Sequence, residues 1–153
     1  MKAAWYRRNG LAQDVLEVGE LPTPQPAAGE VRVRMHTSGV NPSDVKSRLK
    51  RPLNAALVVP HSDGAGVIDA VGAGVPPERI GQRVWLWNAQ WQRPMGTACE
   101  HVALPAAQAV PLPDGIGFDE AACFGIPALT ALQAVHLAGP LAGQTVLVTG
   151  AGN

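Results

Sequence analysis

Apolar and polar residues alternate most strictly between Glu30 and His36. The apolar positions 31, 33 and 35 would share one face of a strand, and the polar positions 32, 34 and 36 the other. Shorter apolar runs bounded by Gly, Pro or Asn predict further strands over residues 15–18, 66–71, 84–87, 100–104 and 108–112. Since no self-similar period appears, we expect a small barrel or sandwich and not a repeat protein.

Two stretches change to a helical pattern. Asn41-Pro42-Ser43-Asp44 reads as a helix start, with Pro in the first turn and an acidic residue near the positive end of the helix dipole, so a short helix is expected to about Leu49. After Gly117 the composition shifts, and residues 128–138 are rich in strong helix formers before Gly139-Pro140 ends them. We therefore place a boundary near residue 120.

Composition and charge exclude several classes. The chain has 153 residues, 46% of them hydrophobic and 16% charged, which is enough to bury one core and is not typical of disorder. Twelve basic residues balance twelve acidic ones, so neither nucleic acid nor an anionic membrane surface is an expected partner. The N-terminus carries no apolar segment behind its charges and no run of 18 apolar residues occurs, so we expect a cytoplasmic protein. Cys99 and Cys123 lack metal-ligand spacing and are expected to be buried free thiols.

The last residues carry a phosphate-binding pattern. A short apolar strand is predicted over residues 145–149, and it runs directly into Gly150-Ala151-Gly152. In a dinucleotide-binding fold the first glycine makes the tight turn and the second lets the backbone approach a pyrophosphate. The third glycine, the helix that follows it and the residue that selects the ribose substituent would all lie beyond Asn153. A strand with Gly-x-Gly alone is more often a plain turn, but its place after a β-rich domain and a helical connector favours the nucleotide-binding interpretation.

The order of these segments resembles the medium-chain dehydrogenase/reductase superfamily. The resemblance rests on segments at close to the family spacings: MKAAWY, EVRVRMHTSGVNPSDVKSR, PHSDGAGVIDAVGAGV, IGQRVW, GTACEHVALPA, FDEAACFGIPALTALQAV and TVLVTGAG. It implies a mainly β fold with helices (α+β). Residues 1–122 would form a chaperonin-10-like β-barrel, the substrate-side domain, and residues 123–153 a connector helix with the first strand and turn of a truncated Rossmann domain.

The superfamily divides into zinc alcohol dehydrogenases and zinc-free reductases. The positions of the catalytic zinc ligands are matched here by Asn41, Ser62 and about Ile126, and residues 85–96 lack the cysteines of the structural-zinc lobe. Two neutral oxygen donors and an aliphatic side chain do not make the N/S site that zinc prefers, so we expect no metal. His61 would supply one strong ligand only after a one-residue shift of register, and a histidine at a cleft wall is the favoured interpretation.

The resemblance to the zinc-free quinone reductases points to a set of site residues. Asn41, in Asn-Pro-Ser-Asp, is the best active-site candidate, because its amide can orient a carbonyl or a water, and a helix-capping role is equally expected and compatible. Asp44 is expected to be structural. Lys46 stands where many quinone reductases carry Tyr; it could stabilise a developing enolate or quinol oxygen, although a solvated surface lysine is the commoner case. Ser62 would complete the cleft wall.

Thr130 matches a position that contacts the nicotinamide end of the cofactor in the family, with a helical threonine bonded to a carbonyl one turn back as the alternative. Gly150 and Gly152 would approach the cofactor phosphates. Trp85, Trp87 and Trp91 could wall a pocket for a planar quinone, although core packing is the safer interpretation for Trp85.

The activity implied by the resemblance is hydride transfer from NADPH to a small-molecule quinone or conjugated carbonyl without a metal. The isolated chain is expected to be inactive, and its residues from about Pro127 onward are expected to be disordered or to self-associate. Two alternatives stay open: a zinc alcohol dehydrogenase fragment, which a metal assay would reveal, and a standalone binding domain, which would require the reading frame to stop at Asn153.

Overall fold

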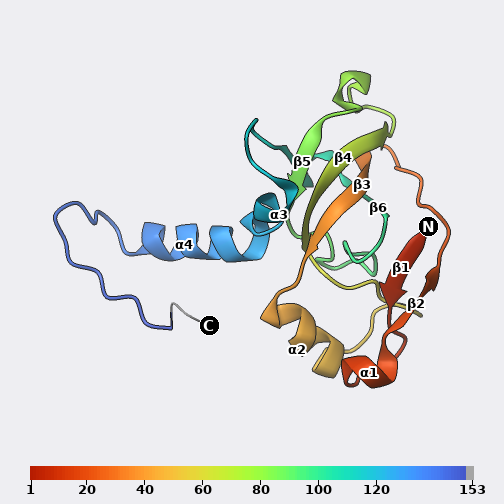
Figure 1. Ribbon diagram of the computed structural model, residues 1–153, viewed down its shortest axis with the longest axis horizontal. Coiled ribbons are helices and arrows are strands. Elements are labelled where there is room, and N and C mark those ends of the chain that lie inside the picture. The colour runs from red at the N-terminus through yellow and green to blue at the C-terminus, as the bar shows by residue number, and fades with distance from the viewer. Residues whose placement is uncertain (151–153) are drawn as a thin grey trace.

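A five-stranded antiparallel sheet forms the centre of the computed structural model, which describes residues 1–150. The strand order is β6-β3-β4-β5-β7, and the sheet curls around its own core (Figure 1). The strands are β3 (Glu30–Gly39), β4 (Asp63–Val71), β5 (Arg83–Leu86), β6 (His101–Pro105) and β7 (Ala109–Pro111). Four of the predicted segments therefore lie in this sheet together with residues 30–36, and the mainly β fold with helices is confirmed.

The alternation that predicted β3 places its apolar face inside the sheet. Val31 and Val33 are completely buried, and Met35 packs against the same cluster. Their partners come from the neighbouring strands, chiefly Ile68, Val84, Leu86, Val102 and Leu104. On the opposite face Arg32 pairs with Asp69 at 2.8 Å. Burial of this apolar set is the main driving force for the sheet.

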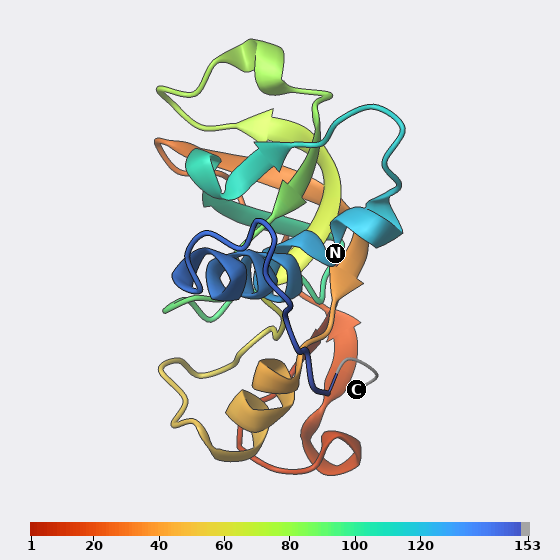
Figure 2. The same cartoon turned by 90° about the vertical axis from the view of Figure 1, so that its left-hand side faces the viewer.

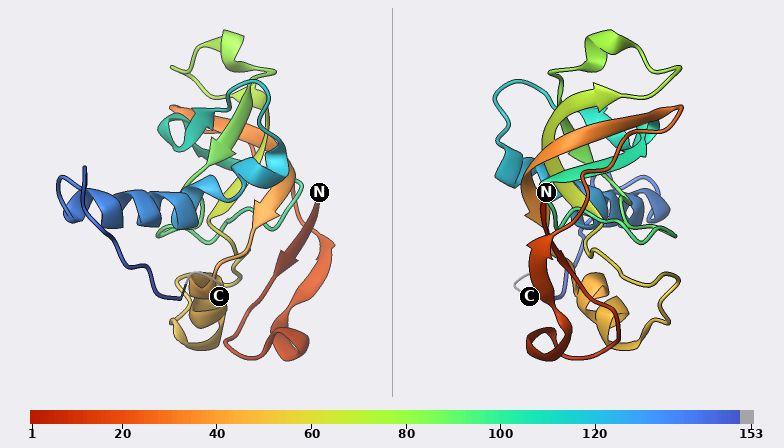
Figure 3. Two further views of the ribbon diagram at one scale, coloured as in Figure 1. Left: turned by 60° about the vertical axis from the view of Figure 1, so that its left-hand side comes forward. Right: turned by 90° about the vertical axis from the view of Figure 1, so that its right-hand side faces the viewer.

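A second sheet has two strands, and only part of one of them was predicted. β1 (Lys2–Trp5) pairs with β2 (Glu17–Glu20), and the short helix α1 (Ala12–Val15) joins them. Residues 15–18 were predicted to be one strand, but Val15 ends α1 instead, because its side chain is buried against Tyr6 and Val58. The ribbon lies beside α1 and α2, away from the C-terminal helix (Figure 3).

Helix α2 (Pro42–Lys50) follows β3 directly and agrees with the predicted helix. Short helical turns occupy three connections: η1 (Pro77–Arg79), η2 (Ala106–Gln108) and η3 (Phe124–Ala128). The last of these is a π-helix turn between α3 (Phe118–Ala121) and α4 (Leu129–Leu137), and together they make up the predicted helical connector.

The stretch after α4 departs from the prediction. Helix α4 projects away from the sheet, and the residues behind it turn back without regular structure (Figures 1 and 2). The strand predicted over residues 145–149 is not formed, because within residues 1–150 no other strand offers it a ladder of hydrogen bonds. Gly150 has a left-handed φ of 72°, as a tight glycine turn requires, whereas Gly152 lies outside the described residues.

Both cysteines are free thiols, but only one is shielded. The single S–H of Cys99 is shared between the carbonyls of Gly96 and His101, and burial raises the pKa of this thiol to about 11. Cys123 is exposed, which corrects the expectation of two buried thiols: it lies on the outward side of the connector. No helix within residues 1–150 is long and apolar enough to cross a membrane.

Candidate functional site

The candidate site is built around Asp63, the first residue of β4, whose side chain is completely buried. Its Oδ2 accepts hydrogen bonds from Asn41 Nδ2 at 2.8 Å and from the main-chain N–H of Ile126 at 2.7 Å. Its Oδ1 is equally buried and has no hydrogen-bond partner within residues 1–150. One carboxylate therefore joins the sheet, the start of α2 and the connector.

Asn41 holds this place because it is the N-cap residue of α2. Its main-chain N–H donates to Asp44 Oδ2 at 2.7 Å, while its side-chain amide reaches Asp63. Asn41 is 5% exposed, so both contacts are shielded from water. The residue thus occupies the cap position, and its side chain contacts the buried Asp63 carboxylate; its place in a cleft wall stays a prediction.

The carboxyls of Asp63 and Asp44 share a poorly solvated region. Burial raises the pKa of Asp63; the hydrogen bonds from Ile126 and Asn41 oppose this, and the charge of Asp44 adds to it. Burial also raises the pKa of Asp44, against its hydrogen bonds to Asn41. Desolvation is the dominant cause at both carboxyls because it disfavours their ionised forms.

Asp63 and its glycine neighbour on the connector are in close contact. A Cβ at Gly125 would lie 2.1 Å from Asp63 Oδ1. Only glycine therefore lets the connector approach closely enough for Ile126 to donate its N–H. Asp63 and Gly125 were not among the predicted site residues, although an acidic residue before Gly-Ala-Gly at the start of an apolar strand was a visible signal.

An open pocket of about 480 Å³ adjoins this junction. Its lining includes Thr130 of α4, together with Trp87 and Asn88 of the loop after β5. Gly125 and Ile126 of the connector line it as well, so Ile126 belongs to both the pocket and the Asp63 junction. Ile126 therefore connects the pocket that contains Thr130 with the junction that contains Asn41.

Ser62 contributes through its main chain. Its carbonyl accepts the N–H of Ala89 at 2.8 Å, which fixes the loop after β5 against the start of β4. Its hydroxyl has no hydrogen-bond partner within residues 1–150. Lys46, by contrast, lies on the exposed face of α2 beside Ser43 and Lys50, away from the Asp63 junction.

The three tryptophans do not wall one pocket. Trp87 lines the pocket beside Thr130, whereas Trp85 packs edge-on against Phe124 with ring centroids 5.8 Å apart. Trp91 is 57% exposed and lines a different pocket. The alternation of β5 carries Trp85 and Trp87 to the same outer face, but the turn that follows takes Trp91 elsewhere.

A directed chain of hydrogen bonds fixes the state of His61. Thr97 donates its hydroxyl proton to the Asp63 carbonyl at 2.6 Å, because a carbonyl can only accept. Ser38 must then donate to Thr97 Oγ1 at 2.8 Å, which leaves Ser38 only as an acceptor toward His61 Nδ1 at 2.9 Å. The Nδ1 of His61 therefore carries the proton, and burial lowers the pKa of the ring. His61 is held at a left-handed φ of 78°, a conformation that is strained for a non-glycine residue.

The potential metal ligands are dispersed. Within residues 1–150 there is no group of three or more His, Cys, Asp or Glu side chains close enough to share an ion. The amide of Asn41, at the first of the three zinc-ligand positions, donates to Asp63, and Ile126 presents its main chain there.

A family model described as "alcohol dehydrogenase GroES-like domain" matches residues 27–114. The quinone oxidoreductase of Rattus norvegicus is 34% identical over 131 residues, which cover 84% of this chain and 39% of that protein. A zinc-type alcohol dehydrogenase-like protein of Schizosaccharomyces pombe is 33% identical over 144 residues, covering 86% of this chain and 42% of that protein. This chain thus spans about two fifths of the length of these relatives.

Solved structures of quinone oxidoreductases also superpose on this chain. The quinone oxidoreductase of Thermus thermophilus, described alone and in complex with NADPH, superposes with a TM-score of 0.70 at 31% identity, covering 90% of this chain and 41% of that one. A quinone oxidoreductase of Pseudomonas syringae pv. Tomato gives a TM-score of 0.78 at 28% identity, with 90% and 41% covered.

Proposed function

We propose, since this chain belongs to the quinone oxidoreductase branch of the medium-chain dehydrogenase/reductase superfamily, that it forms the substrate-side wall of a metal-free reductase cleft. In that cleft a hydride would pass from NADPH to a quinone or conjugated carbonyl. The observation that carries the proposal is the junction of Asn41, Asp63 and Ile126 next to the pocket that contains Thr130.

The pocket beside Thr130 fits one end of a nicotinamide cofactor. Trp87 and Leu129 supply apolar surface for a flat ring, and Thr130 and Asn88 supply polar atoms at its edge. When bound, the cofactor supplies the hydride. This chain would hold the ring end through Thr130, while Gly150 and Gly152 would approach the phosphates.

Asn41 would orient the acceptor. One amide N–H is occupied by Asp63 and the side-chain oxygen by the capping box with Asp44, which leaves the second N–H for substrate or an ordered water. A rigidly held donor near the oxygen that gains charge stabilises the transition state without reorganisation. Ser62 would line the same wall. A role for Lys46 remains a prediction, and it would have to act from the exposed face of α2.

Zinc chemistry is the specific alternative, because one relative is described as zinc-type. The residues do not fit that ion: the amide of Asn41 is already engaged, and the described residues hold no cluster of strong ligands. Elemental analysis of chain purified without chelator tests the point. We expect far less than one zinc per chain, and one full equivalent would favour the alcohol dehydrogenase alternative.

The test of the proposed reaction joins residues 1–153 to the remaining part of the Rattus norvegicus quinone oxidoreductase at the glycine-rich turn. We expect this chimera to oxidise NADPH with a simple quinone, and the 153-residue chain alone to show neither turnover nor measurable NADPH binding. In the chimera Asn41→Ala should lower kcat by about tenfold or more.

Asn41→Ser separates the capping role from the cleft role. Serine is as good an N-cap as asparagine but, like alanine, loses the hydrogen bond to Asp63, so this variant should be more stable than Asn41→Ala and lose turnover to the same extent. If Asn41→Ser retained full kcat, Asn41 would act only as a cap. A chimera that folds and binds NADPH but reduces no quinone or enone would contradict the proposed reaction itself.

A further inference from the structure

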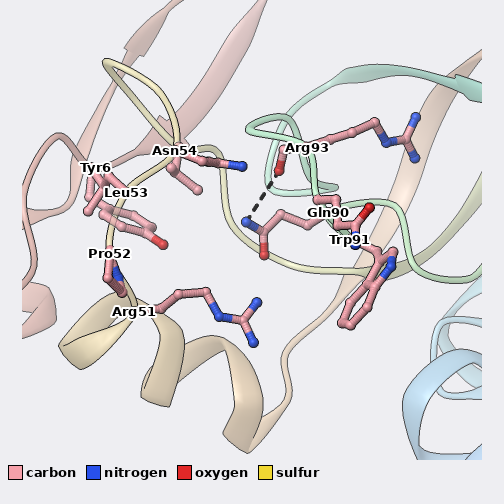
Figure 4. A pocket seen from close by; sticks show the side chains of 10 residues that line it. Tyr6, Arg51, Pro52, Leu53, Asn54, Gln90, Trp91 and Arg93 are labelled. Carbon is pink, nitrogen blue, oxygen red and sulfur yellow. Dashed lines mark hydrogen bonds between the residues drawn. The ribbon is translucent and has the colours of Figure 1, made fainter.

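A separate pocket of about 230 Å³ lies at the C-terminal end of α2, the end opposite to Asn41. Figure 4 shows the Tyr6 hydroxyl, the Arg51 guanidinium and the Gln90 amide turned toward its middle, with the Trp91 indole at its side. The loop that carries Gln90 and Trp91 continues from Trp87, so one loop borders both this pocket and the one beside Thr130.

The base of this pocket is rigid. Tyr6 and Val58 exchange two main-chain hydrogen bonds of 2.9 Å, and their side chains pack with Val15 and Leu53 in one apolar cluster. Tyr6 is 4% exposed as a residue, but its hydroxyl is not among the buried unpartnered atoms of residues 1–150, and the residue lines the pocket. The hydroxyl is therefore open to the pocket and can donate to a ligand.

The charge of the pocket is positive. Arg51 forms no ion pair within residues 1–150, and the lining contains no Asp or Glu. Gln90 donates toward the Arg93 carbonyl, whereas the Arg93 guanidinium turns away and binds Gln108 Oε1 at 2.8 Å. Arg51 therefore faces the pocket as its free cation. Arg48, on the same helix, is occupied by the Gly10 carbonyl.

Three charged side chains act on the pKa of the Tyr6 hydroxyl, and the two largest charge effects come from arginines. Burial raises the pKa of its hydroxyl, and the charges of Arg48 and Arg51 oppose that rise, with Asp44 adding to it. Arg48 and Arg51 each lower the pKa of the hydroxyl by more than Asp44 raises it.

We propose that this pocket binds a planar aromatic acid, with the acid group held by Arg51 and the Tyr6 hydroxyl and the ring lying against Trp91. A guanidinium forms strong charge-assisted hydrogen bonds to a carboxylate, and the Tyr6 hydroxyl can donate a further hydrogen bond to the same group. Trp91 is 57% exposed and offers a large flat surface whose burial favours binding. The site shares no lining residue with the pocket beside Thr130.

The test measures binding of 2-naphthoate to the 153-residue chain by calorimetry, without NADPH. Two matched probes accompany it: 2-naphthamide keeps the ring and lacks the charge, and acetate keeps the charge and lacks the ring. Arg51→Gln removes the proposed cation. Lys50→Gln removes the same charge one residue away, where the side chain does not line the pocket.

We expect 2-naphthoate to bind about tenfold more tightly than 2-naphthamide, and acetate to bind immeasurably weakly. Arg51→Gln should abolish the preference for the acid, Tyr6→Phe should reduce it while leaving the fold intact, and Lys50→Gln should retain it. Equal affinities for acid and amide, an equal loss in Lys50→Gln and Arg51→Gln, or no binding of 2-naphthoate would each overturn the proposal. None of these readouts involves hydride transfer, so they leave the proposed reaction untouched.

Discussion

The main-chain N–H of Ile126 donates to Asp63 Oδ2 at 2.7 Å, so the connector is held by the same carboxylate that holds Asn41. The two donors lie on elements far apart in the sequence, and the acceptor begins a third element. A shift of the connector would therefore change the position of the Asn41 amide. In the proposed cleft, this couples the acceptor side to the pocket beside Thr130.

Gly125→Ala should break this coupling. The added Cβ would lie 2.1 Å from Asp63 Oδ1, so either the connector or the carboxylate must move. We expect a loss of about 1–3 kcal/mol in the free energy of unfolding, measured by urea denaturation. Gly117→Ala is the control, because a Cβ there meets nothing within 4 Å, and its stability should stay within about 0.5 kcal/mol of the parent chain.

Asp63→Asn should flatten the pH dependence of stability. Because folding raises the pKa of Asp63, the native state holds more protons than the unfolded state in the window above the ordinary value of 3.8, and the free energy of unfolding falls as the pH rises through it. The asparagine keeps an acceptor oxygen for Asn41 and Ile126 but does not titrate. Urea midpoints between about pH 3.5 and 7 should therefore decline less steeply in the variant.

The matched control is Asp114→Asn, which replaces an exposed carboxylate in the turn before α3. Some slope should persist in Asp63→Asn, because burial raises the pKa of Asp44 as well. A slope identical to that of the parent would show that Asp63 does not titrate as its burial requires.

The tautomer of His61 can be observed directly. The chain from the Asp63 carbonyl through Thr97 and Ser38 requires the proton on Nδ1, and burial lowers the pKa of the ring, so the neutral Nδ1–H form should dominate at pH 6.5. Nitrogen chemical shifts from long-range proton–nitrogen NMR spectra distinguish the two ring nitrogens. As the pH falls from the ordinary value of 6.5 toward the lowered pKa, the free energy of unfolding should fall, because the unfolded state binds the proton more readily in this window.

Thr97→Val supplies the contrast for His61. Without the threonine hydroxyl, Ser38 is free to donate to Nδ1, and the Nε2–H tautomer should gain population. Thr37→Val removes a nearby hydroxyl that bonds Asp119 and takes no part in the chain, so it should leave the spectrum of His61 unchanged. The directed chain would be refuted by an Nε2–H majority in the parent protein.

The strands could be predicted from the sequence where one face is buried and the other is solvated. β3 shows this best, because Val31 and Val33 are completely buried while Arg34 is exposed. The strand predicted over residues 15–18 was wrong only in its first half, because residues 17 and 18 lie in β2 whereas Val15 ends α1. A short apolar run has the same composition at a helix end as in a strand, and the contact of Val15 with Tyr6 favoured the helix end. The missing strand at 145–149 has the apolar character of a buried strand, but a ladder needs a partner that the described residues lack.

The candidate site was predictable only in part. Asn41 could be identified because Asn-Pro-Ser-Asp is both a helix-start motif and a segment that resembles the zinc-free quinone reductases. Asp63 was overlooked because its role depends on contacts with Asn41 and Ile126, which are 22 and 63 residues away in the sequence. The prediction that Trp85, Trp87 and Trp91 share one pocket was wrong, although the three residues are close in sequence. The chain turns after β5, so Trp91 lines a different pocket from Trp87.

The exposed apolar side chains of α4 predict that this chain self-associates. Leu132 is 65% exposed and Leu137 75%, and Val146 to Val148 behind the helix are exposed as well. These exposed apolar side chains are a candidate interface, because pairing two copies would remove them from water. Sedimentation velocity should show a concentration-dependent rise in mass for the parent chain. Leu132→Glu should restore the monomer, whereas Gln133→Glu, which adds the same charge and removes no apolar side chain, should still associate. A parent chain that sediments as a monomer at every concentration would show that this surface does not pair with itself.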